Sequence, residues 1–146
     1  MQKSQRTRVG VRHRSSKTDE IALIDENESL ARIDAYGAKG FIVNNVEYYS
    51  PVMVYGSTAL LWNVESVKDI SVESLAVIEL VKPSPELLLI GCGATRQNRA
   101  NLGALEDFFG QHGTVVEIMD TSSAASTFNV LNQEGRSVAA ALLPPK

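Results

Sequence analysis

The chain has 146 residues, of which 44% are hydrophobic and 21% are charged, and its formal net charge is −3. A chain of this length predicts one domain that buries about 70% of its unfolded surface. Its apolar runs are shorter than the ~20 residues that a membrane-spanning helix needs. The single cysteine excludes an internal disulfide.

Charge is distributed unevenly along the chain. Residues 1–17 contain six Lys or Arg and no acidic residue, whereas the remaining 129 residues contain eight basic and 17 acidic residues. The acidic body argues against nucleic acid as a partner, because neutralising phosphates requires clustered Lys and Arg. We expect residues 1–18 to form a basic, flexible tail and residues 19–146 to form a single domain. The tail could also be the remnant of an organelle presequence or a partner-binding arm.

The N-terminal half of the body has the pattern of β structure. The acidic segment 19–28 surrounds a short apolar run and predicts an edge strand or a linker. From Arg32 to Val64, β-branched and aromatic residues alternate with turn signals, which predicts strands. We expect a turn between Gly37 and Gly40, and a hairpin turn at Asn44-Asn45 because asparagine tolerates positive φ.

A helix is predicted after these strands. Asp69 or Ser71 can cap its N-terminus, and it is expected to run to about Lys82, before Pro83 and Pro85. One face of this helix would carry apolar residues spaced three apart, namely Val72, Leu75, Ile78 and Val81.

The segment 86–144 predicts a strand–helix–strand–helix–strand series. Apolar runs at 87–90, 114–119 and 137–143 predict the strands. The first helix would begin at Asn98 or Asn101, bury Leu102, Leu105, Phe108 and Phe109, and stop at Gly113; the second would extend from Asp120 to about Asn132 and stop at Gly135. Two crossover helices between three strands require right-handed connections and a parallel sheet. We therefore expect an α/β fold with a mostly parallel C-terminal sheet, which the earlier hairpins either extend or cover as an antiparallel layer.

A Gly-x-Gly sequence lies between the first of these strands and the following helix. Nucleotide-binding proteins carry a glycine-rich turn in this position, but Arg96 replaces the third glycine of their fingerprint and no P-loop sequence follows. An arginine near a helix N-terminus suits a bound anion, and Asp120 has roughly the place of a ribose-binding acid. The simpler interpretation is a tight turn and a helix cap. The candidate anion-binding residues are Gly91, Gly93, Arg96 and Asp120.

Catalytic and metal-binding motifs are not apparent in the sequence. Cys92 lacks a base, because His112 is expected ~20 Å away at the far end of the following helix. The hydroxyl-rich segment 122–127 is not part of a Gly-x-Ser-x-Gly elbow. Two histidines and one cysteine provide no metal-ligand spacing. We therefore expect no catalytic residue, no metal and no cofactor.

The four tyrosines are concentrated between residues 36 and 55. A sheet core explains most of them. The adjacent Tyr48 and Tyr49 must point to opposite faces of a strand, so one of them faces a second layer or a docking patch. The candidate protein-docking residues are Tyr48, Tyr49 and Tyr55.

Several blocks of sequence between Arg32 and Pro145 resemble one known family. They are Gly40-Phe41-Ile42-Val43-Asn44, Trp62-Asn63-Val64, Pro85-Glu86-Leu87 with Gly91-x-Gly93, Ala125-Ser126-Thr127-Phe128-Asn129-x-Leu131-x-x-Glu134-Gly135-Arg136, and residues 139–144. In these blocks the sequence resembles the mitochondrial complex I assembly factor 3 family. The resemblance implies a three-layer α/β fold with an added antiparallel sheet.

The same resemblance implies a function. Family members are non-catalytic and help to build the early matrix-side modules of NADH:ubiquinone oxidoreductase, together with complex I assembly factor 4. It therefore implies a place in the mitochondrial matrix, peripheral to the inner membrane, or in the cytoplasm if the source is bacterial. Two other functions stay open: a small domain that binds an anion or nucleotide at Gly91–Gly93, and an accessory subunit built permanently into a larger assembly.

Overall fold

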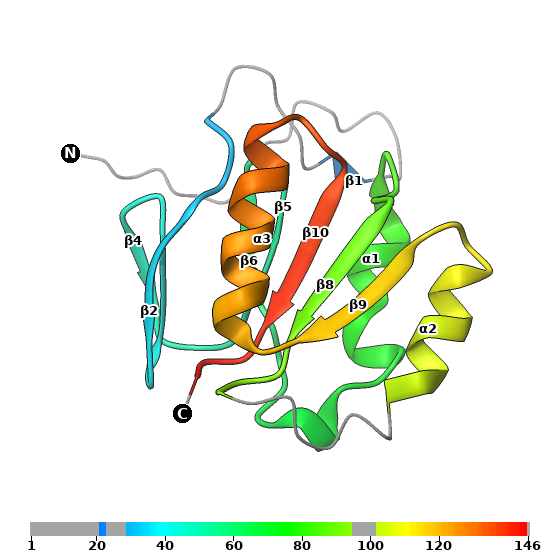
Figure 1. The fold of residues 1–146 in the computed structure, drawn as a ribbon, viewed down its shortest axis with the longest axis horizontal. Coiled ribbons are helices and arrows are strands. Elements are labelled where there is room, and N and C mark those ends of the chain that lie inside the picture. Colours follow the sequence, from blue (N-terminus) through cyan, green and yellow to red (C-terminus); the bar gives the residue numbers. More distant parts are fainter. Residues whose placement is uncertain (1–20, 23–28, 95–101, 146) are drawn as a thin grey trace.

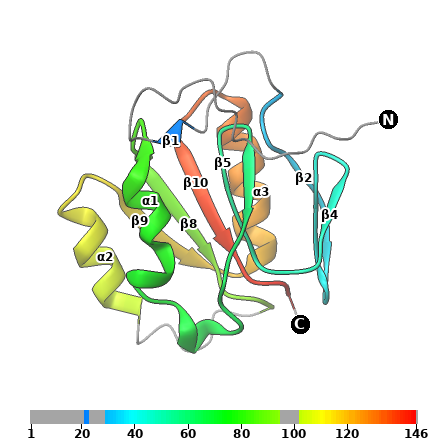
Figure 2. The same ribbon diagram turned by 180° about the vertical axis from the view of Figure 1, so that it is seen from behind.

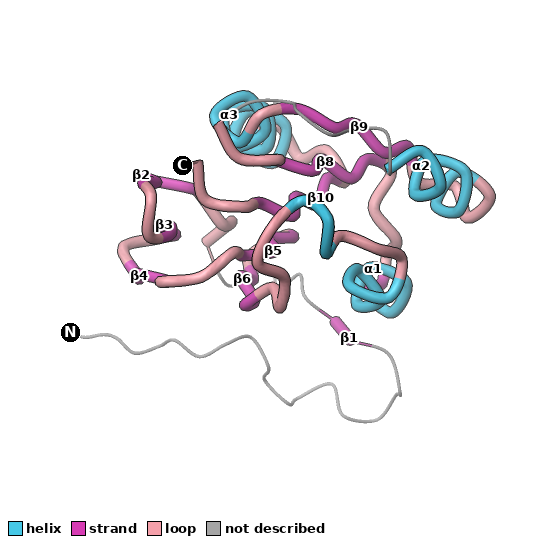
Figure 3. The backbone as a smooth tube through the Cα atoms, turned by 90° about the horizontal axis from the view of Figure 1, so that it is seen from below, coloured by secondary structure: helices cyan, strands magenta, loops and turns pink. Residues whose placement is uncertain are grey.

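The computed structural model describes residues 21–22, 29–94 and 102–145. The predicted basic tail, Arg96 and the two candidate helix starts at Asn98 and Asn101 lie outside these residues. The described part has a five-stranded sheet at its centre with helices on both faces, and a smaller three-stranded sheet beside them (Figures 1 and 3). The predicted α/β class is confirmed.

Three parallel strands form one half of the central sheet. They are β8 (Leu87–Gly91), β9 (Val115–Met119) and β10 (Val138–Leu142), and β10 and β9 flank β8 on either side. The hairpin of β5 (Val52–Tyr55) and β6 (Thr58–Leu61) extends the sheet, because β5 pairs antiparallel with β10. The strand order is therefore β6-β5-β10-β8-β9, and β10, the last of the described strands in sequence, lies at its centre.

The helices cover opposite faces of this sheet. On one face, α1 (Ala76–Leu80) and α2 (Gly103–Gly110) pack against alternate strand residues such as Leu88 and Ile90 (Figure 2). On the other face, α3 (Thr121–Gln133) packs against the residues between them, such as Leu89. Both faces are therefore dry, which is why the parallel strands are apolar without alternation.

The three-stranded sheet is a separate antiparallel layer. It consists of β2 (Ile33–Gly37), β3 (Gly40–Val43) and β4 (Val46–Tyr48), in that order. Its apolar face packs on the same side of the central sheet as α3, through Ile33, Phe41 and Val43. The predicted turn at Asn44-Asn45 is confirmed, with φ of 51° and 69°. Both alternatives for the hairpins are thus realised, because one extends the sheet and the others form a layer.

The helix predicted from Asp69 or Ser71 to Lys82 is wrong over most of its length. The chain makes two 3₁₀ turns, Val67–Asp69 and Glu73–Leu75, and only then the short helix α1. A strict three-residue apolar spacing suits 3₁₀ geometry as well as an α-helix. Local hydrogen bonds favour the turns: the Asp69 carboxylate accepts from the Glu65 and Ser66 N–H groups, and Ser71 and Ser74 bond each other.

The structure also tests the edge strand expected within residues 19–28 and the helix expected to stop at Gly113. The chain after α1 becomes strand β7 (Val81–Lys82), which pairs in parallel with β1 (Ile21–Ala22), so an edge strand within residues 19–28 is confirmed. Gly113 has the expected positive φ of 87°, but α2 already ends at Gly110. The buried residues predicted for this helix are found buried, except that Phe108 is only partly covered.

Candidate functional site

The Gly91–Gly93 turn lies at the carboxyl end of β8, between the ends of β10 and β9. The Leu143 N–H donates to the Gly91 carbonyl at 3.0 Å, and the Cys92 N–H donates to the Met119 carbonyl at 2.9 Å. A Cβ atom on Gly91 would lie 2.9 Å from Leu142 Cδ2 and 3.0 Å from Thr121 Cα. Gly93 has φ of +96°, a conformation that favours glycine. Close packing and backbone shape therefore require both glycines.

Thr121 connects the turn to the neighbouring segments. Its buried hydroxyl accepts from the Gly93 N–H at 2.8 Å and donates to the Leu143 carbonyl at 2.6 Å. The Thr121 N–H in turn donates to the Gly93 carbonyl at 2.8 Å. One threonine thus fixes three chain segments at this end of the sheet. Sequence reasoning did not identify it, although the hydroxyl-rich start of the helix was a signal.

Asp120 is the N-cap of α3. Its carboxylate accepts from the Ser123 N–H at 3.2 Å, and its carbonyl accepts from the Ala124 N–H. The structure therefore brings Gly91, Gly93 and Asp120 to one end of the sheet. The Cys92 and Gly93 N–H groups, which would bind an anion, already donate to protein oxygens. Anion binding by these residues and Arg96 stays a prediction.

The three candidate docking tyrosines have different environments. Tyr49 follows β4 and is 73% exposed, whereas Tyr48 is partly buried against the core below the small sheet. They differ in exposure, as expected for adjacent residues that face opposite ways. Tyr55 was predicted to dock a partner, and this is wrong: it is 3% exposed, and its hydroxyl donates to the Pro83 carbonyl. The reason is that β5 is buried along its whole length.

Three exposed apolar side chains lie around the three-stranded sheet, on both of its sides: Tyr36 and Val46 are on the side of the core, since they pair with Phe41 and Val43, and Tyr49 is on the other side. Tyr36 on β2 and Val46 on β4 are exposed as well as Tyr49. We call Tyr36, Val46 and Tyr49 the tyrosine surface. The Tyr36 hydroxyl lies 2.9 Å from the Ser122 Oγ on α3, and the Tyr49 hydroxyl donates to the Glu47 carboxylate. The latter bond and the charge of Glu47 raise the pKa of Tyr49.

Two asparagines on α3 hold the chain that enters the small sheet. The Asn129 side-chain amide accepts from the Ile33 N–H at 2.8 Å and donates to the Ile33 carbonyl at 2.9 Å. The buried Asn132 donates to the carbonyls of Ala31 and Gly56. This geometry gives the Phe128-Asn129 block of the sequence a structural role, because Asn129 adds two hydrogen bonds to Ile33, the residue of β2 that also pairs with Val43 of β3.

The described residues contain no group of three or more His, Cys, Asp or Glu side chains that could hold a metal ion. Within the same residues, no helix has the length and hydropathy to cross a membrane. Cys92 is buried in the core, whereas His112 is exposed after α2, with its Nδ1 2.8 Å from the Phe108 carbonyl oxygen. Cys92 is thus part of a buried turn, and His112 is part of the chain that follows the end of α2.

The sequence profile of a family described as "Protein of unknown function (DUF498/DUF598)" matches residues 33–143. A protein of Danio rerio named NADH dehydrogenase (ubiquinone) 1 alpha subcomplex assembly factor 3 is 42% identical over 129 residues, covering 88% of this chain and 73% of that protein. Its namesake in Xenopus tropicalis is 41% identical over 114 residues, covering 78% of this chain and 61% of that protein.

Solved structures show the same fold. The solution structure of a Bordetella pertussis protein described as a Mth938-like domain aligns with a TM-score of 0.63 and 29% identity, covering 78% of this chain and 85% of that one. The family match spans strands β2 to β10 and helices α1, α2 and α3, and among the described elements it leaves out only strand β1. The chain belongs to the complex I assembly factor 3 family, within the wider family whose profile matches residues 33–143.

Proposed function

We propose that this protein promotes assembly of respiratory complex I by binding other proteins, without catalysing a reaction. The observation that carries the proposal is the 42% identity to an assembly factor over 88% of the chain. The geometry agrees with it, because the glycine turn, Thr121 and Asp120 are engaged in structural hydrogen bonds.

The tyrosine surface is the proposed docking surface. Tyrosine is enriched at protein interfaces, since its ring is large and its hydroxyl still bonds in a wet rim. Tyr49 is the most exposed of the large apolar side chains on this surface, and Tyr36 and Val46 stand on the outer strands of the same sheet. Tyr48 stays a candidate on the opposite, core-facing side of its strand, where it is partly buried.

The proposed partners are complex I assembly factor 4 and early matrix-side subunits of complex I. The proposed location is the mitochondrial matrix, peripheral to the inner membrane, or the cytoplasm if the source is bacterial. Support for both comes from the family, whose members are named for complex I assembly.

Complementation tests the docking role. Cells that lack their own assembly factor 3 are supplied with the wild-type chain or with a Tyr36→Ala/Tyr49→Ala variant, and complex I is measured by native gel electrophoresis. We expect the double variant to restore less complex I at equal protein level. Val130→Ala, which changes an exposed apolar side chain on α3, is the matched control and should restore it normally. Equal restoration by both variants would reject the tyrosine surface.

The same assay tests the absence of catalysis. Cys92→Ser and Asp120→Asn remove a thiol within the glycine turn and a carboxylate at the same end of the sheet. Both variants should restore complex I to the wild-type level if they are folded. Loss of complex I with a folded variant and retained partner binding would contradict a role in binding alone, and a turnover activity abolished by either change would show that the protein is an enzyme.

A further inference from the structure

Strand β9 is an edge of the central sheet. In the strand order it pairs only with β8 among the described strands, and the ladder is parallel. The Val115 N–H donates to the Glu86 carbonyl, and the Met119 carbonyl accepts from Cys92, so these residues direct their backbone toward β8. In a parallel ladder alternate residues turn the other way. The backbone N–H and C=O groups of Val116 and Ile118 therefore point away from β8, in the plane of the sheet, toward its open edge.

The side chains of β9 leave its outer edge accessible to one more strand. Val116 and Ile118 are buried under α2, while Val115 and Glu117 are exposed on the face that carries α3. Val115 is 59% exposed, which is high for a strand valine. Natural edges are commonly blunted by charged side chains, especially lysine, by proline or by a bulge. The five residues of β9 contain no lysine and no proline, the ladder to β8 has no register shift, and the one charged side chain is the carboxylate of Glu117, which would repel an acidic strand but attract a basic one.

The negative charge of β9 and its neighbouring helices favours a basic strand at this edge. Residues 103–133, which extend from the start of α2 through β9 to the end of α3, contain no Lys or Arg and four acidic residues, Glu106, Asp107, Glu117 and Asp120. The connection after α3 adds one charge of each sign, Glu134 and Arg136. A second copy paired antiparallel about the centre of β9 would place two Glu117 carboxylates opposite each other, which is unfavourable. A basic strand would instead place Lys or Arg beside Glu117.

We propose that the β9 edge binds an extended, basic segment of a partner protein, which adds a strand to the central sheet. Backbone bonds to Val116 and Ile118 would supply affinity, and the pairing of a basic side chain with Glu117 would supply specificity. In Figure 3, β9 lies at the end of the central sheet beyond β8, between α3 and α2. The inference rests on the proposed function and adds the chemistry of a partner.

The probe is a capped nine-residue peptide of alternating Lys and Val, compared with one of alternating Glu and Val. Binding to the full chain is followed by NMR chemical shifts and by amide hydrogen exchange. We expect the Lys peptide alone to bind, and to slow exchange of the Val116 and Ile118 amides at least tenfold. Glu117→Lys should weaken binding by about 3- to 10-fold, as expected for reversing one exposed charge pair.

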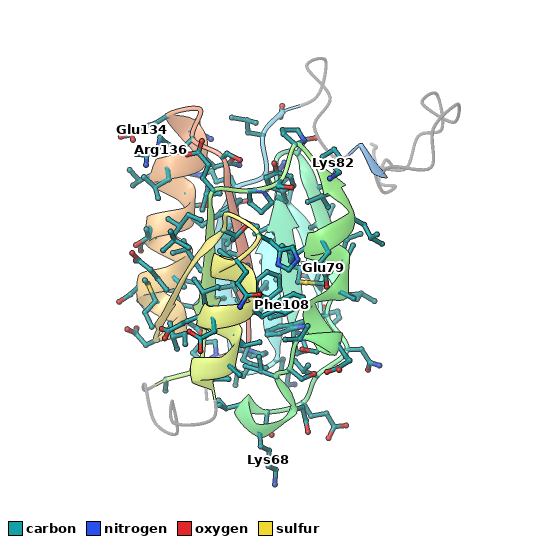
Figure 4. The ribbon with its side chains drawn as sticks, turned by 90° about the vertical axis from the view of Figure 1, so that its right-hand side faces the viewer. Lys68, Glu79, Lys82, Phe108, Glu134 and Arg136 are labelled. Atoms are coloured by element: carbon teal, nitrogen blue, oxygen red, sulfur yellow. The ribbon has the colours of Figure 1, made fainter. Side chains whose placement is uncertain are left out.

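Glu79→Lys is the matched control, since Glu79 is also exposed but lies on α1, away from β9 (Figure 4). It should leave the affinity unchanged. Equal weakening by both variants, or binding without protection of the two amides, would overturn the proposal in favour of diffuse charge attraction. Protection of these two amides without peptide that vanishes when residues 2–17 are removed would overturn the proposal in favour of this chain's own basic segment. Protection that appears together with dimerisation in sedimentation would overturn it in favour of a second copy. Peptide binding is measured without complex I, so its failure leaves the complementation test intact.

Discussion

At the scale of single residues, the Gly91–Gly93 turn depends on one hydroxyl. Thr121 is 0% exposed and connects the Gly93 N–H to the Leu143 carbonyl. Neither group can reach water if the hydroxyl is removed. The turn that suggested a ligand site in the sequence is therefore part of the core. Substitutions that remove its hydrogen bonds should lower the free energy of unfolding.

Thr121→Val preserves the shape of the side chain and removes its hydroxyl. We expect it to lower the free energy of unfolding by about 1–3 kcal/mol, because a buried donor and a buried acceptor lose their partner. Thr121→Ser, which retains the hydroxyl, is the control and should lose less. Urea unfolding of the two variants provides the comparison, and equal losses would show that the methyl group matters more than the hydrogen bonds.

Tyr49 offers a prediction that depends on pH. Its hydrogen bond to Glu47 and the Glu47 charge raise its pKa, so the phenol should ionise at higher pH than a free tyrosine. The stability contributed by this bond is present below the ordinary tyrosine pKa and is lost as pH rises through the raised one. Glu47→Gln should lower the pKa, as followed by NMR of the tyrosine ring carbon, with Tyr49→Phe to assign the signal. An unchanged titration in Glu47→Gln would contradict the contact.

At the scale of elements, α3 connects the two sheets. One side packs on the central sheet through Ala124, Ala125 and Phe128, and Asn129 bonds the first residue of β2. The small sheet has only three strands, and its inner face depends on this packing. Its order should therefore follow the integrity of α3.

Asn129→Ala removes both hydrogen bonds to Ile33. We expect a loss of about 1–2 kcal/mol in the free energy of unfolding and faster amide exchange in β2 and β3, since the entry to the sheet is no longer held. Gln133→Ala changes an exposed side chain on the same helix and should have no such effect. Native-state hydrogen exchange of both variants is the measurement. Unchanged exchange at Ile33 in Asn129→Ala would show that strand pairing alone holds β2.

The sequence was informative for elements whose residues determine them locally. Uninterrupted apolar runs predicted β8, β9 and β10, and Asn44-Asn45 predicted its turn. The prediction of one helix over residues 69–82 was wrong because an apolar spacing of three fits a 3₁₀ helix as well as an α-helix. Tyr55 failed because alternation cannot reveal a strand covered on both faces. Thr121 was missed because a hydroxyl at a helix start normally caps that helix, and its true partners are distant in the sequence.

At the scale of the whole molecule, the described residues are expected to behave as one domain. Trp62 lies in the core on the α1 and α2 face, while Phe41 and Val43 lie in the core on the α3 face, and β8 and β10 contribute to both. Shared strands couple the two cores. The two sides should therefore lose their structure together.

We expect Trp62 fluorescence, far-ultraviolet circular dichroism and NMR signals of β3 to report the same midpoint in urea. Phe128→Ala, which removes a fully buried ring on the α3 face, should shift all three midpoints downward together, with a loss of about 3–5 kcal/mol. Separate midpoints in the wild-type chain would show two independently folding units. An unshifted tryptophan transition in Phe128→Ala would show the same.

The central place of β10 has a consequence for biosynthesis. Of the described strands it is the last to leave the ribosome, yet it stands between β5 and β8 and pairs with both. The nascent polypeptide consequently cannot close its main sheet until β10 has emerged. A premature stop codon before this strand would leave the β5–β6 hairpin separated from β8, so the truncated product should be degraded by proteases.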